Sequence, residues 1–273
     1  MKLTLFAAWA GLTFGAPFAV LALHGAGLPL SAGVLAMTAL ATLAVTVAEH
    51  VAPFEPKWSV DHGDARVDRL HALGSMAVVA ALVPLVARVP SLGWWPTRWP
   101  FVAQLAAALL LAELGAYWAH RLMHTTQLLW RVHLVHHSAR RLHALNASRN
   151  HPLDTALGFL AAAVPLVALG APAEVLAATG ALAAVHLQFQ HLNATLELGP
   201  LNLLFAGPEP HRWHHSRVEA EANGNYGHVL SLWDGVFGTR VAPPGRPPVD
   251  VGVFSPRDEV PEQLGVQLLV PFR

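Results

Sequence analysis

The chain has 273 residues, of which 54% are hydrophobic and only 12% are charged, whereas a soluble domain carries about 25% charged residues. This composition favours an integral membrane protein. The formal net charge is zero, so no nucleic-acid partner is expected, and the lack of cysteine excludes disulfides, thiolate metal sites and cysteine nucleophiles. Histidine is frequent, with 17 residues, as many as lysine and arginine together.

Apolar stretches dominate the first half of the chain, at about 3–23, 29–48, 72–89 and 101–119. A bilayer crossing takes roughly 20 apolar residues, so these stretches predict four transmembrane helices. The first is expected to be a retained helix and not a cleaved signal, because its apolar run is long and no clean A-x-A site follows it. A fifth region, at about 155–185, is interrupted by the turn signal Gly170-Ala171-Pro172 and predicts a hairpin that dips into the membrane, or two short helices.

The distribution of basic residues predicts the orientation. With a cytoplasmic N-terminus, the segments 49–71, 120–152 and 187–273 lie inside and the loop 90–100 lies outside. The outside region holds Arg88 and Arg98. The inside segments hold Lys57, Arg66, Arg69, Arg121, Arg131, Arg140, Arg141, Arg149, Arg212 and Arg217. This asymmetry agrees with the positive-inside rule and places the dense histidine groups on the cytoplasmic face, which we expect to be that of a bacterial inner membrane.

The expected fold is therefore an all-α integral membrane protein with about four transmembrane helices, a membrane-dipping helical hairpin and a cytosolic histidine-rich helical cap. Three regions are expected along the chain. Residues 1–100 form the N-terminal transmembrane helices, 101–240 the histidine-rich catalytic region, and 241–273 a proline-rich tail. No oligomeric state is predicted.

Three tight histidine groups share a spacing that suits metal binding, because residues three or four apart lie on one helix face. They are the H-x3-H pair His120 and His124, the H-x2-H-H group His133, His136 and His137, and a second H-x2-H-H group His211, His214 and His215. A further pair, His186 and His191, is spaced H-x4-H, which sets the two side chains roughly 140° apart on a helix. Spacing alone favours a structural role for His186 and leaves His191 open between ligand and structural residue.

So many imidazoles exceed the needs of one ion and predict two. Neutral imidazole suits Fe, Zn, Cu and Ni. The chain has neither the H-E-x-x-H motif of a zincin protease nor the Glu-x-x-His pairs of ferritin-like carboxylate sites. An all-imidazole shell leaves the charge of the metal uncompensated and favours a Lewis-acidic centre.

The segments "HLVHHSARRLHALNASRNHP" (133–152) and "NYGHVLSLWDGVFGT" (225–239) resemble the fatty acid hydroxylase / sterol desaturase superfamily, and the resemblance covers about 105–240. "QFQHLN" (188–193) is similar to a histidine-before-asparagine feature of many members, which makes His191 a ninth ligand. Two departures stand out. Thr195 replaces a second histidine that some members carry, and Gly235-Val236 replaces the usual Arg-Leu, so a contact made by that arginine is in doubt.

The resemblance implies a membrane-bound non-haem di-iron enzyme that uses O2 to hydroxylate a lipid, such as a sterol, fatty acyl chain, alkylglycerol or carotenoid. It also implies two iron ions, for which zinc could substitute in a purified sample, and an external electron donor, either a reductase with ferredoxin or a cytochrome. Desaturation at the same site is the alternative. A membrane metal transporter or a haem-binding electron carrier is the alternative of another class, although transporters place ligands near the membrane midplane.

The predicted site is the di-metal centre itself, with no separate acid or base. The expected metal ligands are His120, His124, His133, His136, His137, His191, His211, His214 and His215. The residues expected to orient these ligands are Asn146, His151, Asn193, Asn225, His228 and Asp234.

Overall fold

The computed structural model describes residues 2–272, and in that range every regular element is a helix. Six long helices form the body: α1 (Lys2–Gly25), α2 (Leu30–Val51), α3 (Ala65–Val86), α4 (Phe101–Thr125), α6 (Pro152–Leu169) and α7 (Ala173–Gln190). Shorter helices lie between and after them: α5 (Gln127–His137), α8 (Pro208–His214), α9 (Glu219–Ala222), α10 (Leu232–Val236) and α11 (Leu264–Leu269). Five 3-10 turns complete the order: η1 (Pro56–Ser59), η2 (Ala144–Ser148), η3 (Gly199–Leu203), η4 (Pro256–Asp258) and η5 (Val270–Phe272). The predicted all-α class is confirmed.

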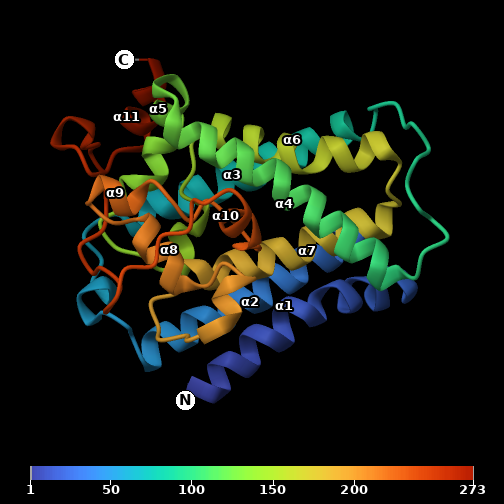
Figure 1. The fold of residues 1–273 in the computed structure, drawn as a ribbon, viewed down its shortest axis with the longest axis horizontal. Helices are drawn as coiled ribbons and strands as arrows, with labels where there is room; N and C mark the ends of the chain where they lie inside the picture. The colour runs from blue at the N-terminus through green and yellow to red at the C-terminus, as the bar shows by residue number, and fades with distance from the viewer. Residues whose placement is uncertain (1, 273) are drawn as a thin grey trace.

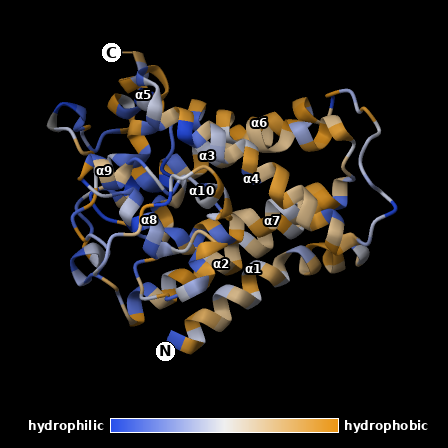
Figure 2. Cartoon of the chain, viewed as in Figure 1, coloured by the Kyte–Doolittle hydropathy of each residue, from blue (hydrophilic) through white to orange (hydrophobic). Residues whose placement is uncertain are grey.

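Five of the long helices, α1 to α4 and α6, are long and apolar enough to cross a membrane. The 24 residues of α1 rise about 36 Å, more than the roughly 30 Å of a hydrocarbon core. Large apolar side chains on α2, among them Leu35, Leu43 and Val47, are more than half exposed. Figure 2 shows the apolar residues concentrated along the bundle and the polar ones at its ends. Such uncovered apolar surface needs lipid, so the chain is an integral membrane protein.

The long helices lie side by side, and the other elements gather at one end of the bundle (Figure 1). Helix α7 packs against α1 and α2, while α6 packs against α3 and α4. The start of α1, the loop after α2, helix α5 and residues 191–272 meet at one end, which we call the cap. The loop between α3 and α4 and the turn between α6 and α7 lie at the opposite end.

Helices α6 and α7 form the predicted hairpin, with its turn at the predicted position. Gly170 ends α6 with φ of 92°, a left-handed conformation that glycine adopts without a steric cost. The hairpin is longer than the sequence suggested. Its turn reaches the far-end loop, where Leu92 and Trp95 donate backbone hydrogen bonds of 2.8 Å to Ala168 and Leu169. Helix α7 can run the full length of the bundle because α1, α2 and α4 cover it. It therefore needs little apolar surface toward lipid.

Close contact between α4 and α6 brings two chemically important ends together. A Cβ on Gly115 would lie only 2.1 Å from the carbonyl oxygen of Ala161, so the two backbones touch where the side chain is absent. Helix α4 ends in the cap with His120 and His124, and α6 begins there with Asp154. The packing of two membrane helices thus sets the distance between these cap residues.

Candidate metal centre

Four separate elements carry the nine predicted ligands into the cap. The last two turns of α4 hold His120 and His124, and α5 holds the whole first H-x2-H-H group. Helix α8 and its C-cap hold the second group, and His191 is the C-cap residue of α7. Eight of the nine side chains are buried, and only His124 is partly exposed.

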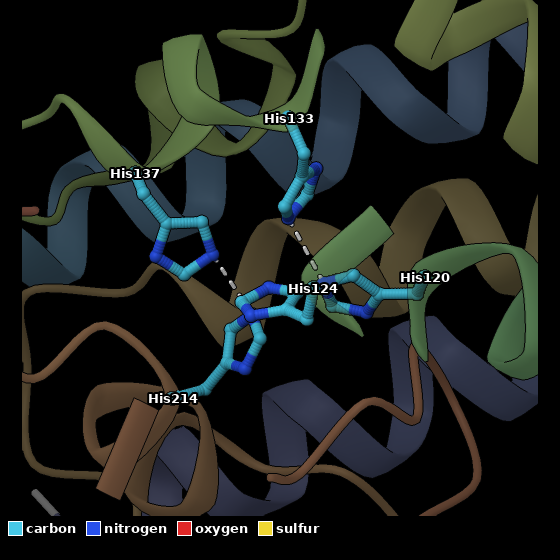
Figure 3. A group of neighbouring side chains, drawn as sticks. All are labelled: His120, His124, His133, His137 and His214. Atoms are coloured by element: carbon cyan, nitrogen blue, oxygen red, sulfur yellow. Dashed lines mark hydrogen bonds between the residues drawn. The ribbon is translucent and has the colours of Figure 1, made fainter. Parts of the chain in front are cut away.

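The nine histidines separate into two groups, in each of which one ring nitrogen per residue lies within 4.8 Å of the others. The five-histidine group consists of His120, His124, His133, His137 and His214, whose rings point toward one another in Figure 3. The four-histidine group consists of His136, His191, His211 and His215. This division accords with the two-ion hypothesis. Both H-x2-H-H motifs contribute to both groups.

The two groups adjoin each other. The rings of His137 and His215, one from each group, stack at 4.5 Å between centroids with planes 23° apart. His136 and His137 are also chain neighbours on α5 that serve different groups. Two ions bound here would therefore share one buried volume at the membrane end of the cap.

In the five-histidine group, hydrogen bonds to oxygen determine which nitrogen faces inward. The Nδ1 of His120 donates to the carbonyl of Tyr226 at 2.8 Å, and the Nδ1 of His133 donates to the carboxylate of Asp154 at 2.7 Å. Their Nε2 atoms then face each other at 3.0 Å. In the neutral rings both are lone pairs, so a cation is needed between them. Two nitrogens bound to one ion at about 2.1 Å and at right angles would lie about 3.0 Å apart.

Buried ring nitrogens without a hydrogen bond give a second indication that the histidine groups suit metal ions. Buried polar atoms nearly always have a hydrogen-bond partner, yet six of the nine imidazoles keep a buried ring nitrogen without one: His124 (Nε2), His136 (Nδ1), His137 (Nδ1), His191 (Nε2), His211 (Nδ1) and His215 (Nδ1). In the four-histidine group, the Nε2 of His215 also lies 3.1 Å from the Nε2 of His136 and of His211. Each neutral ring has one N–H and one lone pair. Nε2 atoms that lie this close, together with ring nitrogens that lack a partner in a buried space, fit bound metal ions.

Burial favours the neutral form, which binds metal, in His191, His211, His214 and His215. Loss of hydration, with smaller effects from neighbouring imidazoles, lowers the pKa of His214 to about 3 and that of His191 to about 3. The same causes hold the pKa of His211 and His215 well below the usual value. No carboxylate belongs to either histidine group, so the charge of an ion would be met only by neutral nitrogens.

Three residues that the sequence did not single out hold the ligands in place. Asp154 accepts from His133, Asn223 lies 3.3 Å from the Nδ1 of His124 through its side-chain oxygen, and the carbonyl of Gly224 accepts from His214 at 2.8 Å. A carboxylate or carbonyl behind a metal-binding histidine fixes its tautomer and raises its basicity. Asp154 stands two residues after the end of the recognised segment 133–152, and this proximity was the signal that the sequence offered.

Of the six residues expected to orient ligands, three lie close to the histidine groups. The side-chain oxygen of Asn146 accepts from the Nδ1 of His191 at 2.8 Å. The ring of His228 stacks on that of His120 at 5.0 Å with planes 8° apart. Asp234 accepts from the backbone nitrogens of Tyr226 and Gly227, and so holds the segment whose carbonyl bonds His120.

The other three bond elsewhere among the described residues. His151 caps α6, accepting from the nitrogen of Leu153, and its other nitrogen meets the carbonyl of Leu268. Asn193 holds the loop after α2 through both the nitrogen and the carbonyl of Glu55. Asn225, with φ of 55°, ties the start of α8 to the tail: it donates to the carbonyls of Pro210 and Val241 and accepts from the nitrogen of Val241.

Three positions that the sequence left in doubt have other surroundings than the ligands. His186 accepts from the indole of Trp9 at 3.3 Å and contacts the carbonyl of Ala206 at 3.0 Å, which is the structural role expected of it. Thr195 lines a separate cavity. At Gly235, the guanidinium of Arg240 takes the space, with a nitrogen 2.9 Å from where a Cβ would stand.

Comparison with known proteins agrees with this arrangement. The family profile described as fatty acid hydroxylase matches residues 105–239. Ornithine lipid hydroxylase OlsE of Rhizobium tropici is 38% identical over 248 residues, covering 85% of this chain and 74% of that protein. Alkylglycerol monooxygenase of Homo sapiens is 34% identical over 152 residues, covering 53% of this chain and 31% of that protein. Methylsterol monooxygenase 1 of Rattus norvegicus is 27% identical over 147 residues.

No solved structure matches the chain. This chain thus spans about three quarters of the Rhizobium relative and only a third of the human one. By name, all three relatives are lipid hydroxylases or monooxygenases. The resemblance noted in the histidine motifs is confirmed, and the chain belongs to the fatty acid hydroxylase family of oxidoreductases.

Proposed function

We propose that the protein is an O2-dependent di-iron hydroxylase of a membrane lipid. The observation that carries this proposal is the pair of adjoining, buried, all-imidazole groups at the membrane end of the cap. The five-histidine group would hold one iron and the four-histidine group the other. Two iron ions at this place would supply the activation of O2 and the attack on an unactivated C–H bond.

The protein's own residues bind, orient and exclude water. The Nδ1 proton of His133 stays on the ring because the Asp154 carboxylate accepts it, and the Nδ1 proton of His191 stays because Asn146 accepts it. Both rings therefore keep Nε2 for the metal. Burial of eight of the nine side chains keeps bulk water from the centre, which protects reactive species from side reactions.

The relatives support an acyl or alkyl lipid as substrate, since their names refer to ornithine lipid, alkylglycerol and methylsterol. We propose an acyl lipid with a polar headgroup, following the relative that matches most of this chain. Electrons would come from a separate donor, a reductase with ferredoxin or a cytochrome. Residues 101–240 would carry the chemistry, with 1–100 and 241–273 as its membrane and cap supports.

The location of the histidine groups argues against a transporter. All nine lie at helix ends or on short cap helices, whereas transporter ligands lie near the membrane midplane. The proposed orientation puts the cap on the cytoplasmic face of a bacterial inner membrane, where soluble electron donors have access.

The test is lipid mass spectrometry on a bacterial host that expresses the chain, with and without O2. Gain of one oxygen atom in a host lipid, only in air, supports hydroxylation. Loss of two hydrogens instead would assign desaturation. A haem Soret band in the purified protein, or an unchanged lipid profile with iron bound, would overturn the proposal.

A further inference from the structure

A second cavity, separate from the metal centre, lies on the other side of α8. It has a volume of about 290 Å³, and its lining includes Phe54, Thr195, Glu197, Glu209, Arg212 and Arg246. Arg212 is the chain neighbour of His211, and it donates to the carbonyls of Leu192 and Ala194, next to His191. Two of the segments in the cavity wall therefore also supply ligands to the four-histidine group.

Arg212 is an unusual residue for such a wall. It is only 2% exposed, and its Nε has no hydrogen-bond partner. In residues 2–272 its guanidinium bonds backbone carbonyls and forms no ion pair with a carboxylate. Burying an unpaired charge costs several kcal/mol, roughly. Glu209 favours the charge of Arg212 at longer range than an ion pair. A buried guanidinium with an unbonded Nε that lines a cavity therefore indicates an anionic ligand.

A second guanidinium strengthens this indication. The Cζ atoms of Arg212 and Arg246 lie 3.8 and 4.5 Å from the ring centroid of Phe54. Arg246 already lies 3.7 Å from a carboxylate oxygen of Glu55. A ligand anion between the two guanidiniums would further offset their mutual repulsion, and the planar guanidinium suits a carboxylate or a phosphate. Arg246 is also exposed, so the cavity is open to the outside.

The same cavity carries acidic groups. Glu197 pairs with Lys2, and Glu209 accepts from Asn202 at 3.4 Å. A cavity with two arginines and two glutamates complements a zwitterion, with its anionic group at the arginines and an ammonium at the glutamates. Its volume is just below the range of about 300–1,000 Å³ of pockets for drug-sized ligands, which suits a compact headgroup.

The position of the cavity selects a lipid as the source of that headgroup. Phe54 stands three residues after the end of α2, and Lys2 begins α1. These are the points at which two membrane helices enter the cap (Figure 1), the level of lipid headgroups. We propose that this cavity binds the zwitterionic amino-acid headgroup of the lipid substrate, with Arg212 and Arg246 on its carboxylate; the inference rests on the proposed function.

The experiment measures binding by calorimetry to the metal-loaded full chain in detergent. The probe is N-octanoyl-ornithine, which has one carboxylate and one ammonium. N-octanoyl-putrescine lacks the carboxylate, and N-octanoyl-norvaline lacks the ammonium. We expect each analogue to bind about tenfold more weakly or worse, since hydrogen bonds to charged groups contribute about 1.5–3 kcal/mol. Equal binding of the putrescine analogue would overturn the proposal. Free ornithine that binds as tightly as the acylated probe would assign a free amino acid and overturn the lipid source.

Variants test the assignment to this cavity. Arg246→Gln replaces an exposed charged side chain and should weaken binding of the probe about tenfold. Arg257→Gln, an exposed arginine of the same tail outside the cavity, is the matched control and should leave affinity unchanged. Unchanged binding in Arg246→Gln would overturn the proposal.

Measurements of hydroxylation distinguish a failure of the proposed hydroxylase function from a failure of the proposed headgroup cavity. His214→Ala should abolish hydroxylation but keep the probe affinity. Binding without any hydroxylation in the unaltered chain would refute the proposed function alone. Hydroxylation that does not discriminate between the three probes would refute the headgroup cavity alone.

Discussion

The carboxylate of Asp154 lies 2.7 Å from the Nδ1 of His133, and both side chains are buried. Asp154 stands in the first turn of α6, a membrane helix, and His133 stands on α5 in the cap. The pair therefore couples the membrane part of the bundle to the five-histidine group.

Loss of this carboxylate should weaken one metal site. In Asp154→Asn the amide no longer holds the Nδ1 proton of His133 as a charged acceptor does, so its Nε2 is less basic and less well oriented. Loss of such a supporting group costs about 10–100-fold in metal affinity. Iron titration of the apo-protein, followed by elemental analysis, measures the affinity and the number of bound ions. Asp250→Asn, an exposed aspartate of the tail, is the control. Two ions bound with unaltered affinity in Asp154→Asn would contradict this role.

Single substitutions should separate the two histidine groups. His136→Ala removes a member of the four-histidine group and His214→Ala a member of the five-histidine group. Each variant should insert into the membrane but lose at least one of two ions and all lipid hydroxylation, because the proposed reaction would use both ions. Elemental analysis and lipid profiling measure the two effects. His62→Ala, in the exposed loop before α3, should retain both. Full activity in either group variant would remove that histidine from the centre.

The histidine set was predictable from the sequence, whereas its division was not. Motif spacing is local, so H-x3-H and H-x2-H-H identify helix faces directly. His136 and His137 are about 100° apart on α5, and which of them meets His191 depends on how α7 and α8 pack against that helix. The supporting residues depend on packing too. Asp154 is 21 positions from its partner His133 and shares no periodic pattern with it.

The membrane helices show the same contrast. The order of the first four follows from apolar run length, which is a local property. The sequence predicted about four spans and a hairpin, whereas five helices are long and apolar enough to cross a membrane. The full length of the hairpin does not follow from apolar run length, because α7 contains the buried polar residues His186, Gln188 and Gln190. Those residues lower its hydropathy but are covered by neighbouring helices, which composition alone does not reveal.

Removal of metal should destabilise the folded cap. With nine imidazoles converging and six buried nitrogens unpaired, bound ions would stabilise the native state only. A ligand at 100 times its Kd adds about 2.7 kcal/mol to the free energy of unfolding. Thermal unfolding in detergent, before and after chelation, measures this effect. Reloading with Fe(II) should restore the melting temperature. An identical melting temperature in the chelated and loaded protein would speak against structural metal sites.

Glu113 should matter for stability although it lies about two helical turns from His120, the nearest ligand on α4. Its carboxylate, buried in α4, accepts from the backbone nitrogens of Val229 and Leu230 at 2.7 and 3.0 Å. Glu113→Ala leaves two buried N–H groups unbonded, at a cost of about 1–3 kcal/mol each. Glu113→Gln retains an oxygen acceptor, so its free energy of unfolding should fall much less. Unfolding midpoints of the two variants measure the difference, and equal midpoints would show that the carboxylate does not hold this segment.

The orientation of the cap can be tested cleanly because the chain contains no cysteine. His62→Cys places one thiol in the exposed loop at the cap end, and Trp94→Cys places one in the far-end loop, where the indole is 73% exposed. In intact bacteria a membrane-impermeant maleimide should label the protein with Trp94→Cys and not the one with His62→Cys, because the positively charged loops favour a cytoplasmic cap. Lysed cells, in which both thiols should react, are the control. The reverse pattern in intact cells would place the metal centre on the outer face and would require an electron donor on that side.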